Sequence, residues 1–336
     1  MPMHGYKAPP WLAGVGAWGG NVQTIWPALF SHHHDDRRPR GVPFQRERWT
    51  TPDEDFIDVD WYRAGPADAE RPLLVLFHGL EGSSESHYAQ AFAHWAHERG
   101  WDYAVPHFRG CSGEPNRAPR TYHSGDFEEV GWILSRFKAA HHGPVMAMGI
   151  SLGGNALLRW VEEAGSTASS MVCAAAAVSA PLDLAAAGRA IGSGFNRLVY
   201  TRMFMRSLKP RALTKWQQHP GLFDRAALMA APDLYAFDNA FTAPVHGFAS
   251  TEDYWARCSA KPWLKDVTGL PTLVLNARND PFVPASCLPE RHEVSSWVTL
   301  WQPDEGGHVG FPGGPVPGYV TPLPRTVGSW LAQHLT

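Results

Sequence analysis

A serine between two glycines marks the stretch of this chain whose residue types most clearly predict chemistry. Gly149-Ile150-Ser151-Leu152-Gly153 follows the apolar run 145–148 and leads into residues 155–161, which have helical spacing. A strand, a tight turn with a central serine and a helix form the layout of a nucleophile elbow, which exposes the serine hydroxyl at the end of a sheet. A side chain at 149 or 153 would clash with the adjoining strand or helix. The pattern predicts Ser151 as a nucleophile.

A serine nucleophile needs a general base, and the base needs a carboxylate to orient it. Both residue types follow Ser151 in the chain order expected for such a fold, each in a loop after a strand. Asp280 follows the apolar strand 272–276, and His308 lies between glycines after the strand 297–301. Asp280 precedes a proline and on its own also fits an ordinary turn. The three residues in order favour His308 as general base and Asp280 as its orienting group.

A second loop is predicted to supply one of the two groups that stabilise an oxyanion. The strand 71–77 leads into a His-Gly turn at His78, the position where such folds find a backbone donor. We predict an oxyanion hole made by the backbone N–H groups of Leu80 and Leu152. His78 lies in the wrong loop to act as the triad base, so we interpret it as a structural turn histidine.

Motifs spread over most of the chain resemble the YheT-like branch of the α/β-hydrolase family. This branch includes abhydrolase-domain lipases of eukaryotes and medium-chain acyl ethyl ester synthases of yeast. The matching stretches are 21–27, 46–56, 60–61, 78–84, 107–114, 122–126, 149–155, 179–184, 253–255, 258–260, 279–282 and 306–311. The resemblance implies an α/β-hydrolase fold with a helical cap, carboxylic-ester chemistry and a Ser-Asp-His triad, which Ser151, Asp280 and His308 would form here.

Alternating apolar strands and amphipathic helices independently predict the α/β class, with a mainly parallel twisted sheet flanked by helices. The connection between the strand 171–179 and the strand at 272 is too long for a loop and predicts an inserted helical cap. We expect a core formed by 1–184 and 266–336, with 1–45 wrapping its surface, and a cap at 185–265. Apolar residues between 195 and 208 fit either a helix packed on the core or an acyl-chain pocket.

Composition and charge exclude several classes of function. The formal net charge of −3 gives no reason to expect a nucleic-acid partner. The four cysteines are widely spaced, as expected for reduced thiols. An apolar run long enough to span a bilayer and the features of a secretory signal are both missing from the sequence, which predicts a cytoplasmic protein. The predicted chemistry requires neither a metal nor an organic cofactor.

Three functions fit these residues. The favoured one is a serine hydrolase that cleaves short- to medium-chain acyl esters, which are its small-molecule substrates. The second is an alcohol acyltransferase that uses the same acyl-enzyme. The third is a non-catalytic binding module, which would not need the Ser-Asp-His set.

Overall fold

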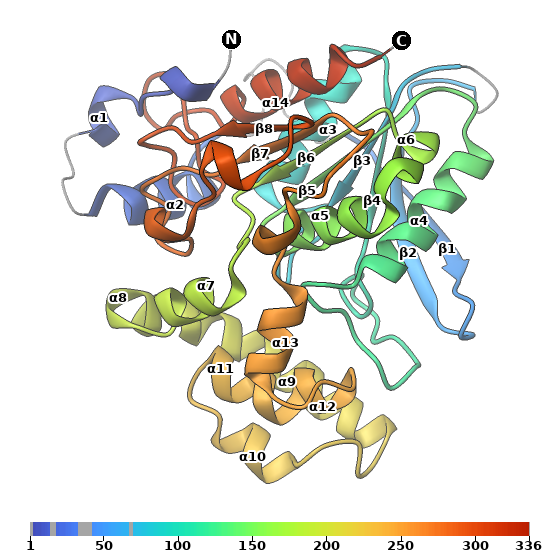
Figure 1. Cartoon of the computed structure of the whole chain (residues 1–336), viewed down its shortest axis with the longest axis vertical. Helices are drawn as coiled ribbons and strands as arrows, with labels where there is room; N and C mark the ends of the chain where they lie inside the picture. The colour runs from blue at the N-terminus through green and yellow to red at the C-terminus, as the bar shows by residue number, and fades with distance from the viewer. Residues whose placement is uncertain (1–2, 14–17, 33–41, 67–69, 336) are drawn as a thin grey trace.

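One twisted sheet organises the molecule (Figure 1). The computed structural model describes residues 3–13, 18–32, 42–66 and 70–335, and in these residues eight strands form a sheet of order β1-β2-β4-β3-β5-β6-β7-β8. The first two strands are antiparallel, β2 pairs antiparallel with β4, and the strands from β4 to β8 run parallel. The strands are β1 Gln45–Thr50, β2 Phe56–Tyr62, β3 Leu73–Phe77, β4 Asp102–Pro106, β5 Val145–Ile150, β6 Ala174–Val178, β7 Thr272–Leu275 and β8 Val298–Trp301.

Helices cover both faces of the sheet, and this explains its continuous apolar strands. In β3 all five residues are buried; Leu73, Val75 and Phe77 join the core on one face, and Leu74 and Leu76 join the core on the other. Helices α4 (Phe127–Ala140), α5 (Leu152–Ala164) and α6 (Ala168–Met171) cover the first face, and α3 (His87–Glu98) and α14 (Pro322–Ala332) cover the second. The predicted fold class, an α/β protein with a mainly parallel sheet, is confirmed.

The connection between β6 and β7 is helical and projects from one end of the sheet (Figure 1). It contains two single π-helical turns. Arg197–Thr201 leads directly into α9, and Asp238–Thr242 directly follows α11. We call residues 185–265 the cap. Its helices are α7 Leu184–Ile191, α8 Gly194–Asn196, α9 Arg202–Gln218, α10 Arg225–Ala230, α11 Leu234–Phe237, α12 Ala243–Val245 and α13 Thr251–Cys258.

The N-terminal segment lies beside the loops that follow β7 and β8. Its helices are α1 (Pro10–Ala13) and α2 (Gly19–Leu29). Within α2 the side chain of Gln23 is buried, so this segment does more than cover the surface.

Candidate active site

Ser151 occupies a strained turn between β5 and α5. Its backbone has φ 52° and ψ −120°, a conformation that L-residues rarely adopt. A Cβ atom at Gly149 would lie 2.3 Å from the carbonyl oxygen of Gly153, and one at Gly153 would lie 2.4 Å from the carbonyl oxygen of His78. Helix and strands therefore pack too closely for any side chain at these positions, as the sequence predicts.

Three predicted residues meet at the carboxyl ends of the parallel strands. The Nε2 atom of His308 lies 3.0 Å from Ser151 Oγ, and its Nδ1 atom lies 2.8 Å from Asp280 Oδ2. Because a carboxylate only accepts hydrogen bonds, Nδ1 carries the proton and Nε2 is free to accept the serine proton. The other oxygen of Asp280 accepts from the backbone N–H groups of Phe282 (2.7 Å) and Val283 (3.3 Å), which fixes the carboxylate.

The loop that carries His308 is held by four side-chain oxygens. The backbone N–H groups of residues 306 to 309 donate in turn to Gln23 (2.8 Å), Asn279 (2.9 Å), Thr24 (2.8 Å) and Ser179 (3.1 Å). Asn279 also donates to the Oε1 atom of Gln23 at 2.9 Å. Two of the four oxygens come from α2, at the far end of the chain.

These positioning residues were missed by the sequence analysis, which treated residues 1–45 as a surface wrap. The signal available was the motif 21–27, noted there for its resemblance to a family. A Cβ atom at Gly310 would lie 1.8 Å from the carbonyl oxygen of Gln23, so the loop and α2 approach each other backbone to backbone. Such a long-range contact has no local spacing pattern.

Leu80 and Leu152 border the same cavity as Ser151 and His308. Leu152 is the first residue of α5, so its backbone N–H has no partner within the helix. Leu80 is the second residue of a turn closed by the 2.9 Å hydrogen bond from Gly82 N–H to the carbonyl of Gly79. In such a turn the N–H of the second residue takes no part in the closing bond. A Cβ atom at Gly79 would lie 3.3 Å from Ser151 Cβ, which places this turn against the serine.

Tyr122 and a cap arginine hold the turn that contains Leu80. The hydroxyl of Tyr122 accepts from the Glu81 N–H at 3.1 Å and donates to the Glu81 carboxylate at 2.9 Å. Arg211 from α9 lies 3.0 Å from the other oxygen of that carboxylate. Glu81 has φ 57°, so the turn needs this external support.

His78 is a structural residue, as predicted. It is fully buried, its Nε2 atom accepts from the backbone N–H of Phe108 (3.0 Å), and its Nδ1 atom donates to the carbonyl of Gly79 (2.8 Å). Burial lowers the pKa of His78 to about 3, so the ring stays neutral near pH 7.

A cavity of about 280 Å3 lies between the strand ends and the cap. Its floor carries Ser151, Leu152 and His308, and its cap side is mainly apolar and aromatic. Phe282 connects the two sides, since its ring packs 4.3 Å from the His308 ring and 6.3 Å from that of Phe204 on α9. The cap residues that border the cavity include Ile191, Phe204, Leu208, Phe237 and Phe241. Helix α9 packs on its neighbours within the cap and also borders the cavity.

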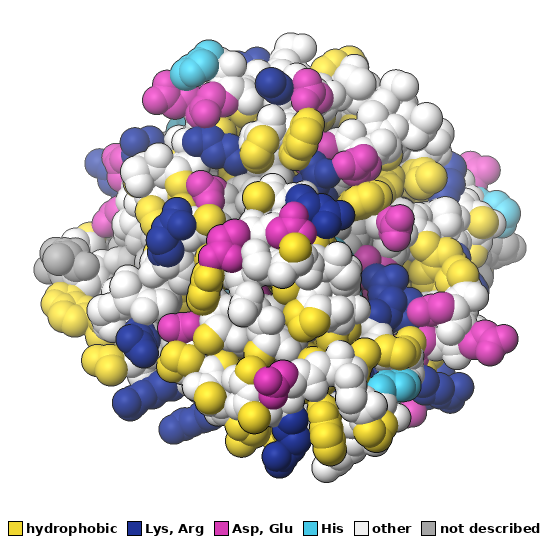
Figure 2. Space-filling view, turned by 60° about the horizontal axis from the view of Figure 1, so that its bottom comes forward, with side chains coloured by type: hydrophobic (Ala, Val, Ile, Leu, Met, Phe, Trp, Pro, Cys, Tyr) yellow, Lys and Arg dark blue, Asp and Glu magenta, His cyan; other side chains and the backbone are white. Residues whose placement is uncertain are grey.

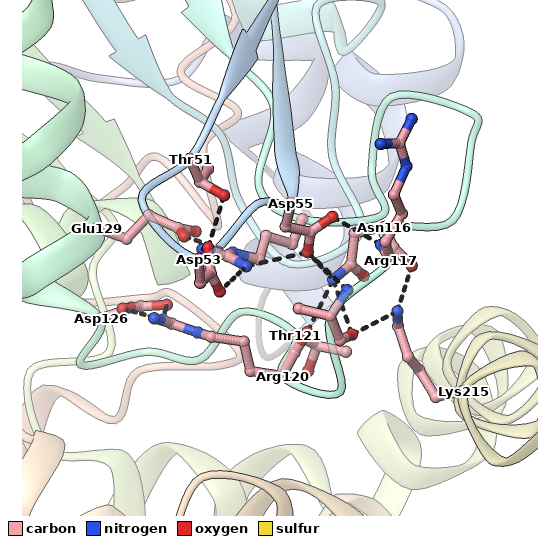
Figure 3. A network of polar contacts seen from close by, with 12 residues as sticks. Thr51, Asp53, Asp55, Asn116, Arg117, Arg120, Thr121, Asp126, Glu129 and Lys215 are labelled. Carbon is pink, nitrogen blue, oxygen red and sulfur yellow. Dashed lines mark hydrogen bonds and ion pairs between the residues drawn. The ribbon is translucent and has the colours of Figure 1, made fainter. Parts of the chain in front are cut away.

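The side wall of the cavity is a long loop, 107–126, that a buried polar network anchors to the core (Figure 3). Arg109 bonds to Asp53 (2.7 Å), Asp55 (3.0 Å) and Glu129 (2.5 Å). Asp55 in turn accepts from the side chain of Asn116 at 2.6 Å. Hydrogen bonds from Arg109 lower the pKa of Asp53 to about 2, whereas burial raises the pKa of Glu129 to about 7.

The same loop receives polar contacts from the cap. Lys215 on α9 donates to the carbonyls of Asn116 and Ala118, the latter at 2.8 Å (Figure 3). His246 accepts from the backbone N–H of Thr121 at 3.3 Å. Burial lowers the pKa of Lys215 to about 8, although these carbonyls favour its charged form.

Two further properties concern metals and membranes. Among residues 3–13, 18–32, 42–66 and 70–335, no cluster of three or more His, Cys, Asp or Glu side chains could hold a metal ion. No helix within these ranges is long and apolar enough to cross a bilayer. The four cysteines are free thiols, three of them buried, as the sequence predicts.

Comparison with known proteins extends these observations. Residues 72–315 match the family described as the alpha/beta hydrolase fold. The chain is 39% identical to an Escherichia coli protein named "Putative esterase YheT", over 94% of this chain and 91% of the relative. It is 30% identical to the Mus musculus protein named "Phospholipase ABHD3", over 80% of this chain and 67% of the relative.

Solved structures show the same fold at low sequence identity. The alpha/beta hydrolase GrgF from Penicillium sp. sh18 has a TM-score of 0.57 at 16% identity, covering 88% of this chain and 99% of its own. The Pyrococcus furiosus esterase PF2001 has a TM-score of 0.51 at 16% identity, covering 87% of this chain and 89% of its own.

Proposed function

Because the chain belongs to the α/β-hydrolase family and resembles YheT along almost its whole length, we propose that it is a serine hydrolase of carboxylic esters. The observation that carries the proposal is the continuous contact from Ser151 through His308 to Asp280. The family resemblance predicted from the motifs is confirmed by the match to YheT. Relatives named as an esterase, a phospholipase and a monoacylglycerol lipase support ester chemistry.

The proposed reaction is acyl transfer in two steps. His308 takes the proton of Ser151 as the serine oxygen attacks the ester carbonyl, and Asp280 stabilises the resulting imidazolium. The oxyanion accepts hydrogen bonds from the backbone N–H groups of Leu80 and Leu152. His308 then protonates the leaving alcohol. A water molecule activated by the same histidine releases the acid and restores Ser151.

The cap side of the cavity supports short- to medium-chain acyl groups as substrates. Phe204, Leu208 and Phe241 offer apolar surface to an acyl tail, and the cavity volume of about 280 Å3 limits its length. We assign catalysis to 1–184 and 266–336 and selection of the acyl chain to 185–265. A cytoplasmic location stays a prediction from the sequence.

The test is hydrolysis of p-nitrophenyl esters from acetyl to palmitoyl by the wild type and by Ser151→Ala. We expect a chain-length optimum in the wild type and no optimum above background in the variant. Adding ethanol separates the two enzyme functions, because an alcohol acyltransferase would form ethyl ester in preference to free acid. A folded wild type that turns over no ester in the series would contradict the proposal and favour a binding module.

A further inference from the structure

The first part of the cap is rich in positive charge. Between residues 184 and 232 the sequence has eight Lys or Arg residues and one Asp, a formal charge of +7, in a chain whose total is −3. The remainder of the chain is therefore acidic, with a formal charge of −10. Such a separation of charge favours a partner of negative charge at one end of the molecule.

Five exposed residues at the start of α9 form one continuous surface, which we call the basic cap face. It consists of Arg197, Leu198, Arg202, Met203 and Arg206. The π-helical turn 197–201 brings residues five apart into line, and the α-helix that follows continues the row at Arg206. Leu198 and Met203 are 58% and 53% exposed, which is uncommon for large apolar side chains.

In the part of the chain that the structure describes, the arginines of this face have no acidic partner. Within residues 3–13, 18–32, 42–66 and 70–335, no carboxylate lies within 4 Å of Arg197, Arg202 or Arg206. By contrast, Arg211 and Lys215 on the inner side of α9 are engaged with the core. Figure 2 turns the cap toward the viewer, and its lower left part shows Lys and Arg side chains among hydrophobic ones, with few acidic side chains between them.

A further aromatic side chain extends the apolar part of the surface. Trp18, from the N-terminal segment, is 53% exposed and packs edge-on against Phe195 at 4.9 Å between ring centroids. Phe195 lies one helical turn before Leu198. Guanidinium groups beside exposed Trp, Leu and Met side chains match the interface of a bilayer, where charge meets acyl chains.

We infer that the basic cap face docks the protein on the surface of a bilayer that contains anionic phospholipids. The apolar side chains distinguish this partner from a nucleic acid. A phosphate backbone attracts the arginines but makes few favourable contacts with Leu198 or Met203. The opposite side of α9 borders the cavity through Phe204 and Leu208. A docked bilayer would therefore lie about one helix diameter, roughly 10 Å, from the cavity, close enough to deliver an acyl substrate.

The test is co-sedimentation with sucrose-loaded vesicles of phosphatidylglycerol and phosphatidylcholine in equal parts, and with vesicles of phosphatidylcholine alone. We expect binding to the anionic vesicles, with weaker binding at high salt. Each arginine near the surface contributes about fivefold in partitioning, so Arg197→Gln/Arg202→Gln/Arg206→Gln loses roughly 100-fold. Leu198→Gln/Met203→Gln weakens binding without changing the charge.

The matched control is Lys7→Gln/Lys138→Gln/Arg325→Gln, which removes the same charge from exposed positions outside the cap. It should bind anionic vesicles like the wild type. Equal binding of the two triple variants, no binding of the wild type to anionic vesicles, or binding to duplex DNA in their place would overturn the inference. Turnover of p-nitrophenyl butyrate by the Arg197, Arg202, Arg206 variant checks folding. Ser151→Ala should bind vesicles like the wild type, so docking and catalysis are tested separately.

Discussion

The floor and the roof of the cavity are held in place by different kinds of contact. On the floor, Ser151, Asp280 and His308 follow β5, β7 and β8, and hydrogen bonds fix each group to its neighbour. The roof is built from the cap, whose apolar side chains line the cavity and whose polar contacts with the core include those of Lys215, Arg211 and His246. From this difference we propose that the core carries out the chemistry and the cap selects the acyl group.

The largest effect on the floor should come from Asp280→Asn. The amide cannot stabilise an imidazolium and favours the wrong tautomer of His308, so kcat should fall by about 10^4-fold. Steady-state hydrolysis of the best p-nitrophenyl ester measures this loss. The control is Asp304→Asn, which alters a 95% exposed side chain just before the loop that carries His308. This variant should keep kcat within about twofold of the wild type. Similar losses in both variants would contradict the assignment of Asp280.

A smaller loss on the floor should follow from Gln23→Leu. The change leaves the backbone N–H of Gly306 without its acceptor and removes one of the two side-chain contacts that hold the His308 loop on α2, the other being that of Thr24. Displacement of a catalytic group by about 1 Å can cost on the order of 10²-fold, so we expect kcat to fall by about 10- to 100-fold with little change in KM. If kcat were unchanged and only the melting temperature fell, α2 would stabilise the fold without positioning His308.

A change in the roof of the cavity should alter the preference for acyl-chain length. Phe204→Ala removes an aromatic ring that borders the cavity, so the chain-length optimum should move toward longer acyl groups. The ratio of kcat/KM for octanoyl and butyryl esters should change by at least about tenfold. Met203→Ala, on the exposed side of the same helix, should leave this ratio unchanged. A uniform loss across the ester series in Phe204→Ala would mean that the cap also positions the catalytic groups.

The smallest effect concerns the polar network that anchors the loop 107–126, the side wall of the cavity. Arg109 lowers the pKa of Asp53 from 3.8 to about 2, so this carboxylate stabilises the fold above pH 3.8 and loses that contribution as the pH falls toward 2. Because 41% of its side chain is exposed, we expect Asp53→Asn to cost about 1 kcal/mol or less at pH 7. Urea unfolding of both proteins should give a smaller difference at pH 3. A constant difference would contradict the ion-pair explanation.

The same contrast explains what the sequence could predict. The elbow glycines and the strand-loop order of Asp280 and His308 are local patterns, and they led to the fold class and to three groups that lie in contact. Gln23 and Asn279 act through contacts about 280 residues and 30 residues away from their own positions, and no periodicity records them. The polar network around Arg109 could not be predicted from the sequence either, because Asp53, Asp55 and Glu129 meet only after the sheet and α4 have packed.

The central claim is that Ser151 is the nucleophile, and labelling with a fluorophosphonate tests it most directly. Such a reagent forms a stable adduct with a serine activated by its histidine, and peptide mass spectrometry locates the adduct. We predict a single adduct on the peptide that contains Ser151, slower labelling of Asp280→Asn, and no adduct in Ser151→Ala. A folded wild type that stays unlabelled, or that carries its adduct on another residue, would contradict the account.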